Sequence, residues 1–273
     1  MTRSSSRCRR WMPGVSGGQW WRRVAARSAN SGHACWATAR SGAANGCLSM
    51  ETKCRRRQRR ASARQVLETR IIEIPVWYND PYTNETGSRF REGYHQRPDG
   101  NDLDYAAEVN GLADAAEFIK RHYESPWLVS MVGFVAGLPF LYQLVDRQHQ
   151  LQVPKYLSPR TDTPALTIGH GGCFSCIYSV RGAGGYQMFG VAAAPIYDPT
   201  QNLKDFKEFM VFFKPGDIVK FTPVDEAEYR RIQKEVDGGT FVYRQAPIQF
   251  DVGAALADPE GYNKTIMEAL NGI

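Results

Sequence analysis

Hydrophobic and polar positions in this 273-residue chain follow regular periods only after about residue 65. Residues 71–78 are β-prone and end in the turn Asn79-Asp80-Pro81, so they predict a strand. Residues 87–101 are polar and predict a loop. Two short helices are then expected, one from a cap at Asn101 or Asp102 to Val109 and one over residues 113–123.

The apolar runs further along the chain are short and are separated by glycine and proline, which is typical of strands and turns. Strands are predicted over residues 127–135, in the glycine-rich stretch 169–190, and over residues 209–213, 218–222 and 240–243. Thr222-Pro223 is predicted to start a helix that ends at Val236, and a last helix is predicted after Asp258-Pro259. The pattern therefore predicts a mainly β domain with added helices, an α+β fold.

The first 64 residues differ sharply from the rest in charge. They hold 15 of the 34 Lys and Arg residues and a single acid, Glu51, which gives this segment a net charge of +14 and the remainder −8. Three interpretations stand: a targeting peptide, a basic tail that binds polyanions, or a segment that is not native coding sequence. We favour the third and predict a disordered segment, because almost no aliphatic residues are present to bury.

Cys173 and Cys176 form a close cysteine pair, but no second pair completes a tetrahedral metal site. We predict reduced packing or turn thiols and no metal, with a redox or regulatory pair as the alternative. The apolar runs are too short to span a bilayer, and the body beyond residue 64 is mildly acidic. We therefore expect a cytoplasmic protein that binds neither membrane nor nucleic acid.

The stretch 169–190 has glycine clusters on both sides of short β-prone runs. It contains neither a Gly-x-Gly-x-x-Gly turn before a helix nor a Walker loop, so it predicts no nucleotide-phosphate site. Its pieces Gly171-Gly172, Ile177-Tyr178 and residues 184–190 resemble the signature of the allophanate hydrolase subunit 1 family. Further pieces resemble that family in order over roughly residues 71–224, among them residues 74–78, His122, Pro159-Arg160 and residues 213–221.

That family includes the B-type subunit of bacterial 5-oxoprolinase and one half of the carboxyltransferase domain of urea carboxylase. The resemblance implies a cyclophilin-like β-barrel over residues 65–224, followed by a helical C-terminal extension over residues 225–273. It also implies a subunit of an ATP-dependent amidohydrolase or carboxyltransferase that acts on 5-oxoproline or a related cyclic amide or urea-type substrate. The active site is expected to be shared with a homologous second subunit, with a third subunit as a further partner, so the chain alone should be inactive.

Several polar residues are expected to share one surface, where arginine offers a fork for a carboxylate and glycine-turn N–H groups offer an oxyanion site. The predicted catalytic residues are His122, Arg160, His170, Tyr178, Tyr186 and Gln187. The predicted substrate-binding residues are Gly171, Gly172, Gly184, Gly185 and Arg181. The alternative for each is an ordinary core, turn or ion-pair residue.

Cofactors follow from the resemblance alone. ATP is expected in the complex, and biotin only through a partner, because the sequence has no biotinyl segment. Phe174, Cys176 and Val191 stand where relatives usually carry Gln, Gly and Arg, which favours a different substrate from the best-known members. A non-catalytic regulator similar to an inhibitor of a sporulation histidine kinase is the alternative function.

Overall fold

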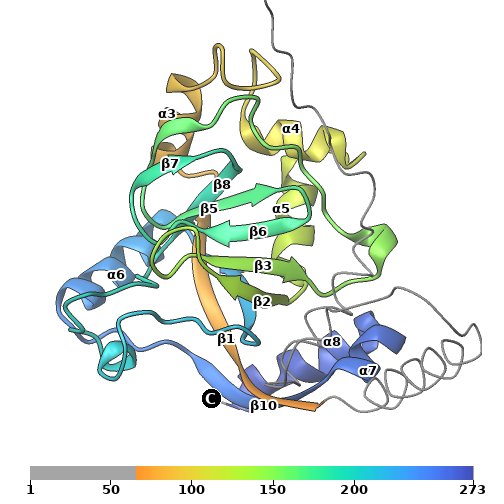
Figure 1. Cartoon of the computed structure of the whole chain (residues 1–273), viewed down its shortest axis with the longest axis vertical. Helices are drawn as coiled ribbons and strands as arrows, with labels where there is room; N and C mark the ends of the chain where they lie inside the picture. Colours follow the sequence, from red (N-terminus) through yellow and green to blue (C-terminus); the bar gives the residue numbers. More distant parts are fainter. Residues whose placement is uncertain (1–65, 273) are drawn as a thin grey trace, which may run out of the picture. The chain divides into compact units, whose positions relative to one another are not determined.

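Strand β1 (Val66–Tyr78) organises the computed structural model, which describes residues 66–272 (Figure 1). It pairs in parallel with β9 (Ile218–Pro223) over residues 71–76 and antiparallel with β8 (Gln187–Ala192) over residues 76–78. The strand order β1-β8-β5-β6-β3-β2-β9 therefore closes on itself. The other strands of this barrel are β2 (Trp127–Val132), β3 (Pro139–Gln143), β5 (Thr167–Gly171) and β6 (Phe174–Ile177). The predicted barrel with added helices is confirmed.

Three further strands lie outside the closed ring. β10 (Gln245–Asp251) extends the sheet by pairing antiparallel with the first half of β1. β4 (Arg160–Thr163) and β7 (Gly182–Gly184) form a separate two-stranded ribbon. The region after residue 224 thus contributes a sheet strand as well as helices.

The barrel interior is filled by alternate side chains of the strands, as the period of two requires. Ile72, Ile74, Leu141, Ile168 and Phe189 are fully buried in one apolar cluster. Helices α4 (Asp102–Val109) and α5 (Ala115–Glu124) add Leu103, Ala106 and Phe118 to that cluster. Each large side chain of this kind contributes about 1.5–3 kcal/mol when fully buried.

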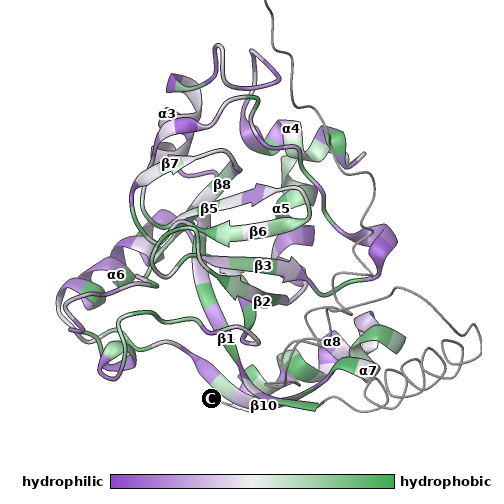
Figure 2. Ribbon diagram, in the orientation of Figure 1, coloured by the Kyte–Doolittle hydropathy of each residue, from purple (hydrophilic) through white to green (hydrophobic). Residues whose placement is uncertain are grey.

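Side-chain caps fix where the helices begin. Asn101 and Asp114 accept backbone N–H bonds at the starts of α4 and α5, close to the predicted positions. Asp80 caps α3 (Pro81–Arg89), a helix that was not predicted because Asn79-Asp80-Pro81 looked like the end of a strand. Figure 2 shows hydrophilic residues over much of α6 (Glu226–Asp237) and hydrophobic ones along β2 and β6.

Four predictions for local structure are wrong. Thr222 and Pro223 belong to β9, and α6 begins after Asp225, whose side chain accepts the Glu228 N–H. Residues 209–213 contain only an isolated bridge between Val211 and Tyr197. Residues 240–243 are not a strand, because Tyr243 stacks on Phe212 instead, and β10 starts at Gln245. The segment predicted as a loop, 87–101, includes the end of α3.

Two helices and three short 3-10 turns complete the secondary structure of the described residues. α7 (Val252–Ala257) and α8 (Pro259–Glu268) follow β10, and Asp258 caps α8 where the sequence predicted a helix. Short 3-10 turns occupy Arg147–His149, Lys204–Phe206 and Ala269–Gly272. Within residues 66–272, no helix is both long and apolar enough to cross a membrane. The prediction made for residues 1–64 lies outside the described residues.

Candidate functional site

The two faces of strands β5 and β6 divide the predicted site residues. Ile168 and Ile177 face each other across the pair and belong to the barrel core, as do the positions His170 and Ser175. The alternate positions, Gly169, Gly171, Phe174 and Cys176, lie on the outer face, where Cys176 packs with Tyr178 and Tyr186 in a second apolar cluster. Residues on opposite faces of a strand cannot line one pocket.

His122 and His170 lie inside the barrel. Ser175 Oγ donates to the Gly169 carbonyl at 3.1 Å, so it accepts from His122 Nε2, which is 3.2 Å away. His122 Nδ1 then accepts the hydroxyl proton of Tyr78, whose oxygen is 2.9 Å away. Both ring nitrogens of a neutral His122 are thereby used.

Burial keeps both histidines neutral. It lowers the pKa of His170 to about 4, and it lowers the pKa of His122 well below its ordinary value, with His170 and Lys220 adding to the effect. His170 Nε2 lies 3.2 Å from the Leu151 carbonyl and must carry the proton, because a carbonyl only accepts. Neither side chain has any exposed surface, so the expected shared surface with Arg160 and Tyr186 is not formed here.

Two tyrosine rings cover the outer face. Tyr186 lies directly on Gly171, where a Cβ atom would come within 2.5 Å of ring carbon Cε1. Tyr178 lies on Gly184 in the same way, with a Cβ atom 2.6 Å from its Cζ. The glycines are therefore required for close approach of the rings. The expectation that Tyr186 is an exposed site residue is wrong, since only 9% of it is accessible.

Arg160 lies beneath this aromatic cover and is fully buried. Its Nη1 donates to the Tyr186 carbonyl at 2.8 Å, its Nε lies 3.3 Å from Thr163 Oγ1, and its guanidinium sits 4.4 Å from the centre of the Tyr156 ring. Nη2 makes no hydrogen bond of good geometry, although the Tyr178 hydroxyl lies beside the guanidinium, and no carboxylate pairs with Arg160 among the described residues. A buried guanidinium stays charged, so it favours an anionic ligand.

A buried carboxylate, Asp102, links Arg160 to the rest of the fold. The Tyr156 hydroxyl donates to Asp102 Oδ2 at 2.8 Å, and Arg91 Nη2 donates to Oδ1 at the same distance. The Met188 N–H donates to Oδ2, also at 2.8 Å, which ties this helix start to β8. We call Arg160, Tyr156, Asp102 and Arg91 the Arg160 cluster.

The Arg160 cluster carries two guanidiniums and one carboxylate. Nε and Nη1 of Arg91 and Nη2 of Arg160 are buried without a hydrogen-bond partner. The neighbouring His95 is neutral, because burial lowers its pKa, and it lies 2.7 Å from Gln187 Oε1. Unpaired positive charge and spare N–H donors in a buried place suit a carboxylate or a developing oxyanion.

The neighbouring hydroxyl and thiol groups act as neutral groups. Burial raises the pKa of Tyr178, Tyr186 and Cys176. Cys176 is thus a buried, protonated thiol of β6, and Cys173 is a half-buried thiol in the preceding turn. Among residues 66–272, no three His, Cys, Asp or Glu residues lie close enough together to hold a metal ion.

The other predicted residues are dispersed. Gln187 contacts His95 and the Pro154 carbonyl at the edge of the Arg160 cluster. Gly172 has a φ of 66° with open space around it, and Gly185 lies against Pro159. Arg181 is exposed and pairs with Asp162 on another part of the surface. Of the predicted residues, the structure thus brings together Arg160, Tyr178, Tyr186, Gly171 and Gly184, with Gln187 at the edge of the Arg160 cluster.

Sequence reasoning missed Asp102, Arg91, Tyr156 and His95. Asp102 carried a signal, because it is an acidic residue directly after the Asn101 cap. It lies on the buried side of α4. Arg91 and Tyr156 carried none, because they come from irregular segments that only the fold brings together.

The comparisons with known proteins agree with the fold. The family model described as carboxyltransferase domain, subdomain C and D, matches residues 43–206. The chain therefore belongs to this carboxyltransferase-domain family, which confirms the resemblance seen in the sequence.

Curated relatives include the urea amidolyase of Lachancea kluyveri, 30% identical over 76% of this chain and 11% of the relative. The B-type subunit of 5-oxoprolinase from Bacillus subtilis is 31% identical over 61% of this chain and 58% of the relative. The chain thus spans less than two thirds of either relative. The crystal structure of Kluyveromyces lactis urea amidolyase matches 82% of this chain and 14% of that one, with a TM-score of 0.66 and 25% identity.

Proposed function

We propose that this chain supplies one half of an ATP-dependent amidohydrolase or carboxyltransferase site that is completed by a homologous second subunit. The substrate is 5-oxoproline or a related cyclic amide or urea-type compound. Family membership and the names of the relatives, a urea amidolyase and the B-type subunit of a 5-oxoprolinase, support this class of reaction. The single observation that carries it is the fully buried Arg160 guanidinium, which no carboxylate neutralises among the described residues.

In this proposal Arg160 binds the substrate carboxylate, or the carboxyl oxygen on which charge develops. Tyr156 positions the guanidinium by stacking, and Asp102 holds the Tyr156 hydroxyl. Tyr178 and Tyr186 cover the site as neutral phenols, so the substrate reaches the guanidinium only when these rings move aside, and the rings then keep water from it and strengthen its electrostatic effect. Losing such a contact in the transition state costs roughly 2.7–4 kcal/mol, on the order of a hundredfold in rate or more.

The glycines do not fit the phosphates of ATP. Gly171 and Gly184 are covered by tyrosine rings, and Gly185 lies against Pro159, so no open cradle of backbone N–H groups forms among them. We therefore assign ATP binding to another subunit, either the second or a third. Biotin, where the complex uses it, is likewise carried by a partner.

Reconstitution tests this function. ATP hydrolysis dependent on 5-oxoproline, and separately on urea, is measured with the chain alone and with a second subunit of the allophanate hydrolase subunit 2 type. We expect turnover only with both subunits. Hydrolysis by the single chain would refute the shared site. A complex without turnover, together with inhibition of a sensor histidine kinase by this chain, would favour the regulator instead.

A further inference from the structure

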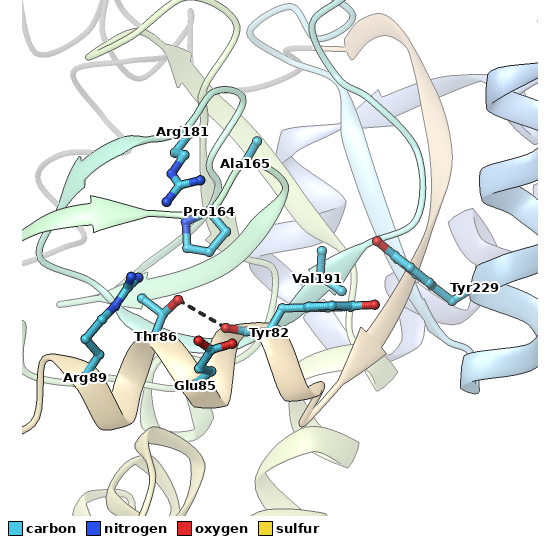
Figure 3. A pocket seen from close by; sticks show the side chains of 9 residues that line it. All are labelled: Tyr82, Glu85, Thr86, Arg89, Pro164, Ala165, Arg181, Val191 and Tyr229. Carbon is cyan, nitrogen blue, oxygen red and sulfur yellow. Dashed lines mark hydrogen bonds between the residues drawn. The ribbon is translucent and has the colours of Figure 1, made fainter.

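A groove of about 370 Å³ lies apart from the Arg160 cluster and shares no residue with it. Figure 3 shows one side of the groove formed by α3 and the other by the segment around Pro164 and by Arg181. Val191 lies deep between these sides and Tyr229 of α6 at one end. Tyr82, Glu85 and Arg89 of α3 line the first of these sides.

One end of the groove is cationic. Arg181 holds Asp162 with two bonds, Nε to Oδ1 at 2.7 Å and Nη2 to Oδ2 at 2.8 Å, and Arg89 Nη2 reaches the same Oδ2 at 3.0 Å. Two guanidiniums thus share one carboxylate, and each keeps N–H groups that make no hydrogen bond to the described residues. This arrangement fixes both cations while leaving donors for a second carboxylate.

Glu85 supplies a negative charge beside that end. A glutamate four residues before an arginine on a helix normally pairs with it, but Arg89 reaches across to Asp162 instead. Glu85 makes no hydrogen bond or ion pair in the part of the chain that the structure describes, and it lines the groove. An acceptor for an ammonium group therefore lies one helical turn from the carboxylate donors.

The rest of the groove is apolar and aromatic. Val191 and Tyr229 are buried beneath its surface, Pro164 is half-buried, and the Tyr82 ring is 39% exposed. Tyr82 is held in place by Trp77, 6.0 Å away edge to face, and by a hydrogen bond from Arg230 to its hydroxyl. A short hydrocarbon side chain can pack here without displacing an ordered group.

We propose that this groove binds a small zwitterion of the α-amino-acid class with an apolar side chain. The carboxylate lies against Arg89 and Arg181, the ammonium group against Glu85, and the side chain against Val191, Pro164 and Tyr82. The site is distinct from the one proposed for catalysis, and it does not depend on that function.

Calorimetric titration of the full chain with L-leucine, and with two analogues that each lack one charged group, tests the proposal. 3-Methylbutylamine lacks the carboxylate and 4-methylpentanoate lacks the ammonium group. We expect L-leucine to bind with a dissociation constant of about 1 mM or tighter, and each analogue at least about tenfold more weakly. No binding of L-leucine, or equal binding of either analogue, would overturn it.

Variants separate the two charges. Glu85→Gln and Arg181→Gln should each weaken L-leucine about tenfold, and Arg181→Gln should leave the residual binding of 3-methylbutylamine unchanged. Glu228→Gln and Arg231→Gln are matched controls, because these two residues form an exposed ion pair of α6 outside the groove. Equal losses in the controls would show a general charge effect and contradict the assigned contacts.

Discussion

Burial determines the protonation of the ionisable residues in and on the barrel. It is the largest cause of the lowered pKa of His122 and His170 and of the raised pKa of Cys176 and Tyr178. These groups are neutral, whereas a guanidinium cannot give up its proton even when buried. Positive charge therefore remains at Arg160 and Arg91. The outer face thus differs from the barrel interior, where the buried histidines are neutral.

The protonation of His170 predicts how stability depends on pH. Its pKa falls from about 6.5 in the unfolded chain to about 4 in the fold, so the unfolded chain binds the proton first. The free energy of unfolding should thus decrease as the pH falls from about 6.5 towards 4, by on the order of 3 kcal/mol from this residue.

Urea denaturation of the wild type and of His170→Gln across this pH range measures the effect. Glutamine keeps a donor for the Leu151 carbonyl but does not titrate. The variant should lose less stability on acidification than the wild type. Parallel curves for the two proteins would contradict the assignment.

Of the predicted site residues, those close to the glycine signature are the ones that the structure brings together. Tyr178 and Tyr186 lie within that signature, and Arg160 follows Pro159, which belongs to another piece that resembles the family. The three residues lie close together in the structure. His170 lies beside them in sequence but on the other face of β5, which only the strand register determines. Arg91 and Tyr156 reach Asp102 from separate loops, and no local pattern indicates such contacts.

At the scale of elements, the strands and helices with clear periods or caps were predictable. Residues 71–78 and 218–222 are β-prone and lie within β1 and β9, and Asn101 caps α4. Helix α3 was missed although Asp80 followed by Pro81 is a good helix start, because the same residues also suit a turn. β10 was displaced from its predicted place because Phe212 and Asp205 hold Tyr243 in other contacts.

The ribbon β4–β7 provides a test of the close approach of Tyr178. Gly184→Ala would force a Cβ atom into the Tyr178 ring, so we expect a loss of about 1–3 kcal/mol in the free energy of unfolding. Gly182→Ala is the control, because the same strand offers open space at that position. Chemical denaturation should separate the two variants. Equal effects would mean that Tyr178 moves aside freely.

For the molecule as a whole, the fold was predictable because short strands, glycine turns and a closing strand all indicated a barrel. The closure itself depends on β1 pairing with both β8 and β9, which a sequence does not reveal. The chain matches less than two thirds of its relatives' length. The Arg160 cluster carries two guanidiniums and one carboxylate, so its positive charge is not balanced by the described residues. This agrees with a site that a second subunit completes.

Steady-state kinetics of Arg160→Lys in the reconstituted two-subunit complex test this interpretation most directly. Lysine keeps the positive charge but has no planar fork, so kcat/KM for the substrate should fall about a hundredfold while the complex still forms. Arg231→Lys, at an exposed ion pair of α6, should change kcat/KM by less than about twofold. If Arg160→Lys turned over substrate as well as Arg231→Lys, Arg160 would not be the group that binds the substrate.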